Sequence, residues 1–232
     1  MATEFTTPRR AIGLILPSSN RVVERVAHRM IEGRDDIDLC FARVPYSGHP
    51  ADGYDMSPFR FAARMLAEAR VEGICWNATR GALLGFEPDR KLCADLQDLT
   101  GVPVTTTALA TLDTLKRHGV TRIALVAQGD RAETDRIAAN FAREGIEVAV
   151  SHSLAIRENF DAARVSSERL LSALRQMDGP ADVQARLIWS TNIEGYSLGT
   201  TTGGMALVFD SASIGMQSLL GLLPDHPVLI GS

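Results

Sequence analysis

Residues 11–26 read AIGLILPSSNRVVERV, and this stretch shows the pattern that recurs along the whole chain. An apolar run stops at Pro17, a short polar segment follows, and Val22, Val23 and Val26 then recur at the spacing of one helix face. An apolar run without polar alternation is typical of a strand that is covered on both faces of its sheet. The stretch therefore predicts a buried strand, a polar loop and a helix, in that order.

The same order of patterns repeats along the rest of the chain. Apolar runs predict strands, and segments with apolar residues three and four apart predict helices. The helix over 57–73 has apolar positions at Phe61, Met65 and Leu66. Further strands are expected at 37–45, 73–76, 102–107, 122–127, 147–154, 185–189 and 205–210. Further helices are expected at 88–101, 108–119, 132–145, 163–177 and 211–223.

Strands that alternate with helices in this way indicate crossover connections and a mostly parallel sheet, so the fold class is α/β. The two halves also resemble each other, because RIALVAQGD (122–130) echoes AIGLILPSSN (11–20) and LIWSTN (187–192) echoes ICWNAT (74–79). We expect two pseudo-symmetric parallel-sheet lobes with the active-site cleft between them. The first covers 1–106, with 211–232 as a segment that could pack back on it, and the second covers 107–210.

Ligands of such sheets bind at the carboxyl ends of the strands. Four polar loops follow predicted strands, and they are expected to converge on one cleft. These loops are 18–20, 77–80, 128–130 and 190–192.

Composition excludes several classes of protein. The chain has 232 residues, of which 45% are hydrophobic and 22% charged, as is ordinary for a soluble globular protein. Its net charge of −4, with both signs interspersed, gives no nucleic-acid footprint. No apolar run approaches the roughly 20 residues that span a bilayer, and the N-terminus lacks an apolar signal core. Cys40, Cys75 and Cys93 are too few and too scattered for a disulfide framework or a zinc site, so a reducing, cytoplasmic setting is expected.

Several motifs carry a resemblance to a known family. They are GLILPSSNRVVE (13–24), RVPYSGHP (43–50), the long stretch 98–126, GDRAETDRIAANFAREGIEV (129–148) and IRENFDAARVSSERL (156–170). In order and spacing they resemble the maleate cis–trans isomerase and arylmalonate decarboxylase family of the aspartate/glutamate racemase superfamily. The likeness runs to about residue 195. The last forty residues match poorly, and GYSLGTTTGGM (195–205) replaces a longer helix.

The resemblance implies a mechanism. One thiol, or two opposed thiols, reaches the cleft and either adds to the substrate or moves a proton at a carbon next to a carboxylate. Hydroxyls and amides hold the carboxylate, and no metal or organic cofactor is needed. The resemblance also implies a small carboxylate substrate and a homo-oligomer, with a dimer the commonest closed assembly. No nucleic-acid or membrane partner is expected.

This chain departs from the family where the thiols should be. The first family cysteine falls on Asn77, and the second falls on Ser190, or on Thr191 if the loop shifts by one. A tyrosine of the family falls on Gln128, while Asn20, Thr79 and Asn159 keep amide or hydroxyl groups. The candidate catalytic residues are Asn77, Ser190 and Thr191. The candidate substrate-binding residues are Ser19, Asn20, Ala78, Thr79, Arg80, Gln128, Asn159 and Asn192.

Other interpretations of these residues stay open. Asn20 could cap a helix, and Asn77 could be a turn residue. Cys75 could be a thiol displaced by two positions, or a small buried side chain. His49 could be a general base or a solvated loop residue. Arg80 could bind a carboxylate bidentately or lie on the surface.

Three functions follow. The first is a divergent isomerase, racemase or lyase that acts on a small carboxylate or amide compound without the usual two-cysteine mechanism. The second is a cysteine-independent hydrolase or hydratase that orients water on the same scaffold. The third is a non-catalytic protein that binds small carboxylates, since a fold does not fix a function.

Overall fold

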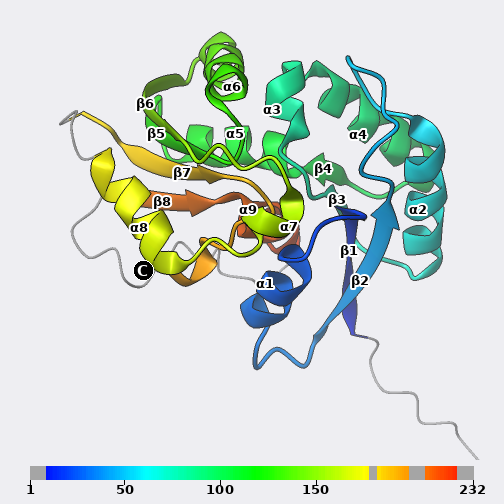
Figure 1. Cartoon of the computed structure of the whole chain (residues 1–232). Coiled ribbons are helices and arrows are strands. Elements are labelled where there is room, and N and C mark those ends of the chain that lie inside the picture. The colour runs from blue at the N-terminus through cyan, green and yellow to red at the C-terminus, as the bar shows by residue number, and fades with distance from the viewer. Residues whose placement is uncertain (1–8, 178–181, 199–206, 224–232) are drawn as a thin grey trace, which may run out of the picture.

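The computed structural model describes residues 9–177, 182–198 and 207–223, and it contains two four-stranded parallel sheets (Figure 1). The first sheet has the order β2-β1-β3-β4. Its strands are β1 (Arg10–Pro17), β2 (Ile37–Val44), β3 (Ile74–Trp76) and β4 (Val104–Thr106).

The second sheet repeats this arrangement with the order β6-β5-β7-β8. Its strands are β5 (Arg122–Ala127), β6 (Glu147–Ser153), β7 (Ala185–Trp189) and β8 (Leu207–Asp210). In each sheet the first strand of the half lies between the second and the third, and every pairing is parallel. The predicted fold class is therefore confirmed. Of the strand expected at 205–210, residues 205 and 206 lie outside the described part of the chain.

Helices cover both faces of each sheet (Figure 1). In chain order they are α1 (Val23–Met30), α2 (Met56–Glu68), α3 (Arg80–Leu84), α4 (Glu87–Thr100), α5 (Thr107–Arg117), α6 (Arg131–Arg143), α7 (Asn159–Ala162), α8 (Ser167–Gln176) and α9 (Ser211–Leu220), with a 3₁₀ turn at Tyr196–Leu198. The helix expected at 163–177 begins later, at Ser167, and the separate short helix α7 precedes it. None of the described helices is long and apolar enough to cross a membrane.

Helix α9 packs on the first sheet although it follows the second along the chain. Its residues Ala212, Met216 and Leu219 join the core formed by β1 and α1. Since β4 ends at Thr106 and α5 begins at Thr107, we propose the lobe boundary between these two residues. The unusual segment noted at 195–205 lies mostly outside the described residues.

Helix α2 buries a different face from the one that the sequence suggested. Phe59 and Leu66 are buried, whereas Phe61 is 66% exposed and Met65 is 44% exposed. The Asp55 side chain caps the helix by accepting from Ser57 N. From this start Phe59 and Leu66, seven residues apart, share one face, and the 100° step per residue turns Phe61 and Met65 away from it. Of the three apolar positions noted for this helix, Leu66 alone belongs to the core.

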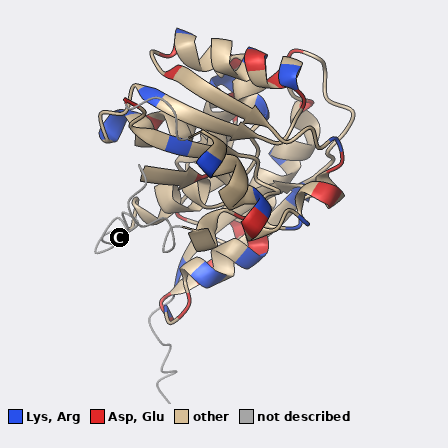
Figure 2. Cartoon of the chain, turned by 60° about the vertical axis from the view of Figure 1, so that its left-hand side comes forward, with Lys and Arg blue, Asp and Glu red and all other residues tan. Residues whose placement is uncertain are grey.

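Basic and acidic residues alternate over the ribbon in the view of Figure 2. Most ion pairs join side chains on the surface, such as Arg131 with Asp135 on one helix and Arg60 with Asp95 between two helices. Exposed pairs of this kind contribute little to stability. The fold therefore depends on its apolar layers.

Candidate active site

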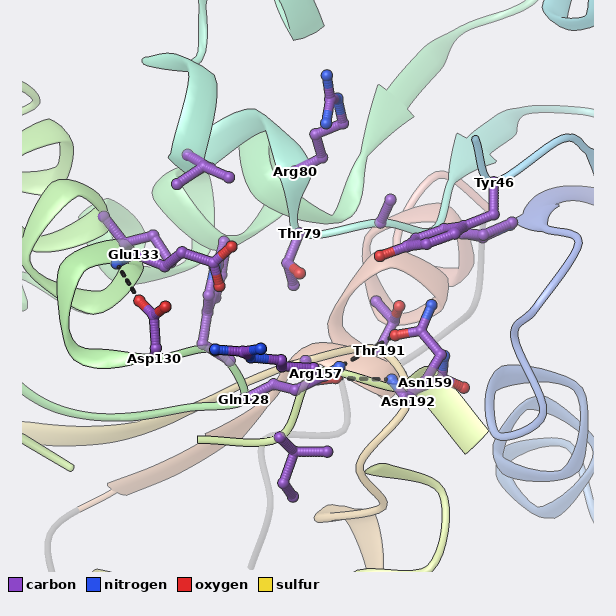
Figure 3. A pocket seen from close by; sticks show the side chains of 18 of the residues that line it. Tyr46, Thr79, Arg80, Gln128, Asp130, Glu133, Arg157, Asn159, Thr191 and Asn192 are labelled. Carbon is purple, nitrogen blue, oxygen red and sulfur yellow. Dashed lines mark hydrogen bonds between the residues drawn. The ribbon is translucent and has the colours of Figure 1, made fainter. Parts of the chain in front are cut away.

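A cavity of about 500 Å³ opens where the carboxyl ends of both sheets meet. Three of the four polar loops expected at a cleft line it, namely 77–80 through Ala78, Thr79 and Arg80, 128–130 and 190–192. Other lining residues are Pro17, Tyr46, His49, Trp76, Leu83, Glu133, Ile137, Ile156, Arg157, Asn159 and Trp189. Figure 3 shows this cavity from close by.

The two tryptophans that end β3 and β7 serve the core and the cavity at once. Trp76 packs edge-on against Phe59 with ring centroids 4.8 Å apart, and Trp189 packs in the same way against Phe141 at 5.2 Å. Both also line the cavity. Aromatic rings fixed from behind give the cavity rigid apolar walls.

A chain of hydrogen bonds runs along the floor of the cavity and joins the two lobes. Ser190 Oγ donates to Gln128 Oε1 at 2.5 Å, and Gln128 Nε2 donates to Asn159 Oδ1 at 3.0 Å. Asn159 Nδ2 in turn donates to Ser19 Oγ at 2.8 Å, which reaches the first lobe. Ser19, Gln128, Asn159 and Ser190 are thus brought together as the sequence suggested, although Ser19 does not line the cavity itself.

Ser190 has no base beside it among the residues that the structure describes. Its hydroxyl donates to the neutral amide of Gln128 and accepts from Asn192 N at 3.0 Å. A serine becomes a strong nucleophile only when an adjacent group takes its proton. The hydroxyl of Ser190 is therefore placed to bind and orient a ligand, and this arrangement gives no support to a serine hydrolase.

The Asn20 side chain forms its hydrogen bonds between the lobes and does not reach the cavity. Its Nδ2 donates to the backbone oxygen of Thr191 at 3.0 Å and to Thr191 Oγ1 at 3.2 Å. Its Oδ1 accepts from Val22 N and Val23 N, which caps the start of α1. The side chain is buried and is absent from the cavity lining. The donors and the acceptor of Asn20 are therefore already occupied, and its contact with a ligand stays a prediction.

Asn77 is also kept out of the cavity. It is fully buried, and its Nδ2 donates to the backbone oxygen of Cys75 at 3.0 Å. Its Oδ1 lies on the side of α9, because a Cβ placed on Gly215 would come within 3.0 Å of it. Asn77 thus packs beneath the loop, and its neighbours Ala78 and Thr79 face the cavity instead.

Cys75 is not a thiol displaced into the site. It is fully buried, and a Cβ on Gly215 would lie 2.7 Å from its Sγ, so it faces α9 as Asn77 does. Burial raises the pKa of the Cys75 thiol well above its usual range, and the thiolate that would react is disfavoured. Cys40 and Cys93 do not line the cavity either.

Thr191 and Asn192 complete the floor. Both are buried, and both line the cavity. Asn192 Oδ1 accepts from Arg21 N at 2.9 Å, which fixes the amide and leaves its Nδ2 without a partner among the described residues. Arg80 lies at the rim, where its Nη2 donates to the Pro50 carbonyl at 2.8 Å.

Charged residues that the sequence did not single out also line the cavity. These are Glu133 at the start of α6 and Arg157 in the loop before α7, and Asp130 lies in a loop that was expected there. The sequence contained a signal for the two acids. Glu133 follows Asp130 by three residues, and an acid three residues after a capping residue marks the start of a helix. Among the described residues no group of His, Cys, Asp and Glu has the arrangement of a metal site.

His49 belongs to the cavity and is held by its surroundings. Its ring packs against Tyr54 and Phe59 with centroids 5.7 Å away in each case. Asp55 N donates to Nδ1 at 3.4 Å, which places the proton of a neutral ring on Nε2. Burial and the nearby Arg80 lower the pKa of His49, while the Pro45 carbonyl and Asp55 oppose this shift. The net shift favours the uncharged form of the imidazole.

We expect Arg80→Gln to raise the pKa of His49 towards the ordinary value of 6.5, because it removes the cation beside the ring. An NMR titration of the His49 ring signals measures this. Arg131→Gln is the control, since Arg131 is an exposed arginine paired with Asp135. Equal His49 titration curves in all three proteins would contradict the assignment.

Comparisons with known proteins show the family of the chain. A model of the arylmalonate decarboxylase family matches residues 50–195. The maleate isomerase of Alcaligenes faecalis is 31% identical over 188 residues, which are 72% of each chain.

Solved structures share the fold at lower identity. The maleate isomerase of Pseudomonas putida S16 superimposes with a TM-score of 0.84 at 21% identity, over 96% of this chain and 98% of that one. The Nocardia farcinica maleate cis–trans isomerase superimposes with a TM-score of 0.81 at 20% identity, over 95% of both chains. A variant of arylmalonate decarboxylase superimposes with a TM-score of 0.77 at 23% identity, over 95% of this chain and 94% of that one. With the family model covering more than half of the sequence, the chain belongs to the arylmalonate decarboxylase family.

Proposed function

We propose that this protein is a cofactor-independent enzyme that binds a small carboxylate and moves a proton at the adjacent carbon, without a cysteine nucleophile. The family resemblance implies proton movement at such a carbon, carried out there by a thiol. The observation that carries the proposal is the cavity lining, which combines hydroxyl and amide groups with an uncharged imidazole and contains no thiol.

The relatives support the choice of ligand. A Pseudomonas putida S16 maleate isomerase variant was solved with maleate, and the Nocardia farcinica enzyme was trapped as a succinylcysteine intermediate. The cavity of this chain offers a comparable carboxylate the hydroxyls of Thr79 and Thr191 and the free Nδ2 of Asn192. Such neutral donors stabilise a carboxylate, and they stabilise an enolate more as its charge grows.

The proton carrier in this proposal is His49. Asp55 N occupies Nδ1, and the proton of the neutral ring lies on Nε2, which has no partner among the described residues, so the ring can donate that proton to a ligand. Ser190 and Thr191 then orient the reacting group, and neither forms a covalent bond to it. Asn77 has no direct part in this scheme because it lies beneath the loop.

The test is calorimetric titration with phenylmalonate before and after Thr79→Val. Loss of the Thr79 hydroxyl is expected to weaken binding by about 1 kcal/mol, which is the usual net value of one hydrogen bond. Thr121→Val is the matched control, because Thr121 lies just before the amino end of β5, away from the carboxyl ends that line the cavity, and its Oγ1 donates to Gln184 Oε1.

Two outcomes oppose the proposal in different ways. Affinity that Thr79→Val leaves unchanged would place the ligand elsewhere. Binding without turnover of any carboxylate would favour a non-catalytic binding protein on the same scaffold.

A further inference from the structure

The loop 18–21, which follows β1, lies outside the cavity lining but holds two residues of the cavity floor. Asn20 Nδ2 donates to Thr191 Oγ1 at 3.2 Å and to the Thr191 backbone oxygen at 3.0 Å. Arg21 N donates to Asn192 Oδ1 at 2.9 Å. Figure 3 shows Thr191 and Asn192 together at one side of the cavity. Two consecutive residues of the first lobe therefore bond to two consecutive floor residues of the second.

These bonds determine which atoms the floor offers to a ligand. An amide NH₂ group and a backbone N–H can only donate, so Thr191 Oγ1 and Asn192 Oδ1 both act as acceptors towards the first lobe. The hydroxyl proton of Thr191 and the Nδ2 group of Asn192 have no acceptor among the described residues. Both residues are buried apart from their contact with the cavity, so an acceptor has to come from that side.

The Asn20 amide fits this network in one orientation. Its Oδ1 accepts from Val22 N and Val23 N, both at 3.0 Å. If the amide were turned over, its NH₂ group would face these two donors and its oxygen would face the Thr191 carbonyl, and both contacts would become repulsive. Thr191 Oγ1 therefore accepts from Asn20, and the proton of the hydroxyl points elsewhere.

The loop is also fixed from its other side, by Arg43 of β2. Arg43 Nη1 donates to the backbone oxygens of Asn20 at 2.9 Å and of Ser18 at 3.3 Å. Its Nη2 donates to Glu24 Oε1 at 2.7 Å, which joins the loop to α1. The position of the Asn20 side chain is thus set by the first lobe before any ligand binds.

We propose that Asn20 is a positioning residue, which directs the Thr191 hydroxyl proton into the cavity and so prepares the floor for the anionic group of the ligand. Donors that are oriented beforehand need no rearrangement as negative charge grows on the ligand. This role requires no contact between Asn20 and the ligand. The inference rests on the proposed function, because it assumes that the cavity binds a carboxylate.

The test is a double-mutant cycle with phenylmalonate as the probe, measured by calorimetry on the full chain. Serine is a good capping residue, so Asn20→Ser keeps the start of α1, while its shorter side chain loses both donations to Thr191. Thr191→Val removes the hydroxyl itself. Each single change is expected to weaken binding roughly tenfold or more, as is usual for one hydrogen bond to a charged group.

The double variant distinguishes a positioning role from a direct contact. It should bind phenylmalonate as weakly as Thr191→Val alone, because the hydroxyl that Asn20 orients is already absent. Two independent contacts with the ligand would instead give losses that multiply. If Asn20→Ser does not fold, Asn20→Thr takes its place in the cycle, since threonine also caps helices and cannot donate as the amide does.

Asn140→Ser is the matched control. Asn140 is another buried amide between the lobes, and its Nδ2 donates to the backbone oxygens of Ala82 at 2.7 Å and Leu83 at 3.2 Å. The change removes a comparable pair of bonds without touching a donor of the floor, so the affinity for phenylmalonate should stay unchanged.

The outcomes that oppose the inference are distinct. Losses that multiply in the double variant would overturn it, because Asn20 would then act independently of the Thr191 hydroxyl, and the proposed function would stand. Equal losses in Asn20→Ser and Asn140→Ser would also overturn it, by tracing the effect to weaker contact between the lobes. Failure of the unmodified protein to bind phenylmalonate would count against the inference and the proposed function together.

Discussion

The purified protein is expected to convert maleate to fumarate more slowly than the Nocardia farcinica maleate cis–trans isomerase by a factor on the order of 10³ or more. That enzyme was trapped as a succinylcysteine, so a cysteine sulfur adds to its substrate. In the described part of this chain no base lies beside Ser190, and Cys75 is buried on the side of α9. Direct assay of both proteins under the same conditions measures the ratio.

Ser190→Cys extends this prediction. It places a thiol at a cavity position without enlarging the residue much, and any gain in maleate turnover would then come from that thiol. Cys93→Ser is the control, since Cys93 lies in α4 and outside the lining. Rapid turnover by the unmodified protein would contradict the assignment, and loss of that turnover in Cys75→Ser would identify Cys75 as the nucleophile.

The fold could be predicted because its signals are long and repeated. The apolar runs at 11–17 and 122–127 are each followed by a polar loop and a helical pattern, and β1 and β5 occupy the same central place in the two sheets. The helix ends were less certain. Helix α2 begins at the cap formed by Asp55, and this start determines which of its residues face the sheet. Apolar spacing alone did not show that Phe61 lies on the exposed face of the helix.

The candidate site could be predicted at the level of loops and less well at the level of side chains. Parallel strands bring their carboxyl ends together, so 77–80, 128–130 and 190–192 had to meet. Within a loop, neighbouring residues face different ways. Ala78 lines the cavity while Asn77 packs under it, and that choice depends on α9, whose Gly215 admits the Asn77 and Cys75 side chains.

The two halves of the chain accordingly share their backbone arrangement, whereas the side chains that they present to the cavity differ. Asn77 and Ser190 each follow the tryptophan that ends a third strand, yet Ser190 lines the cavity and Asn77 does not. Helix α9 closes the first lobe behind Asn77. The groups that orient the ligand are therefore expected to come mainly from the second lobe, with Thr79 and the proton carrier His49 as the contributions of the first.

A buried carboxyl behind the site should make stability fall as pH rises. Asp89 is fully buried and accepts from Tyr54 Oη at 2.6 Å, and its carboxylate fills the space beside Gly81. Burial raises the pKa of Asp89 from 3.8 to about 6, against the opposing effect of hydrogen bonds from Thr106 and Tyr54. Between these values the folded protein binds the proton more tightly than the unfolded chain does, so stability present at low pH is lost through pH 6.

Asp89→Asn should remove this pH dependence of stability, because the amide keeps an acceptor for Tyr54 and does not titrate. From pH 4 to pH 7 the unmodified protein is expected to lose about 2 kcal/mol more free energy of unfolding than the variant does. Urea unfolding at several pH values measures the difference, and the raised pKa of Asp210, about 7, affects both proteins alike. Asp95→Asn on the same helix is the control with the opposite sign, since Arg60 lowers the pKa of Asp95 and that stability is lost as pH falls. Parallel curves for the unmodified protein and Asp89→Asn would mean that Asp89 is already ionised at pH 4 in the folded state, with Tyr54 and Thr106 compensating for its burial.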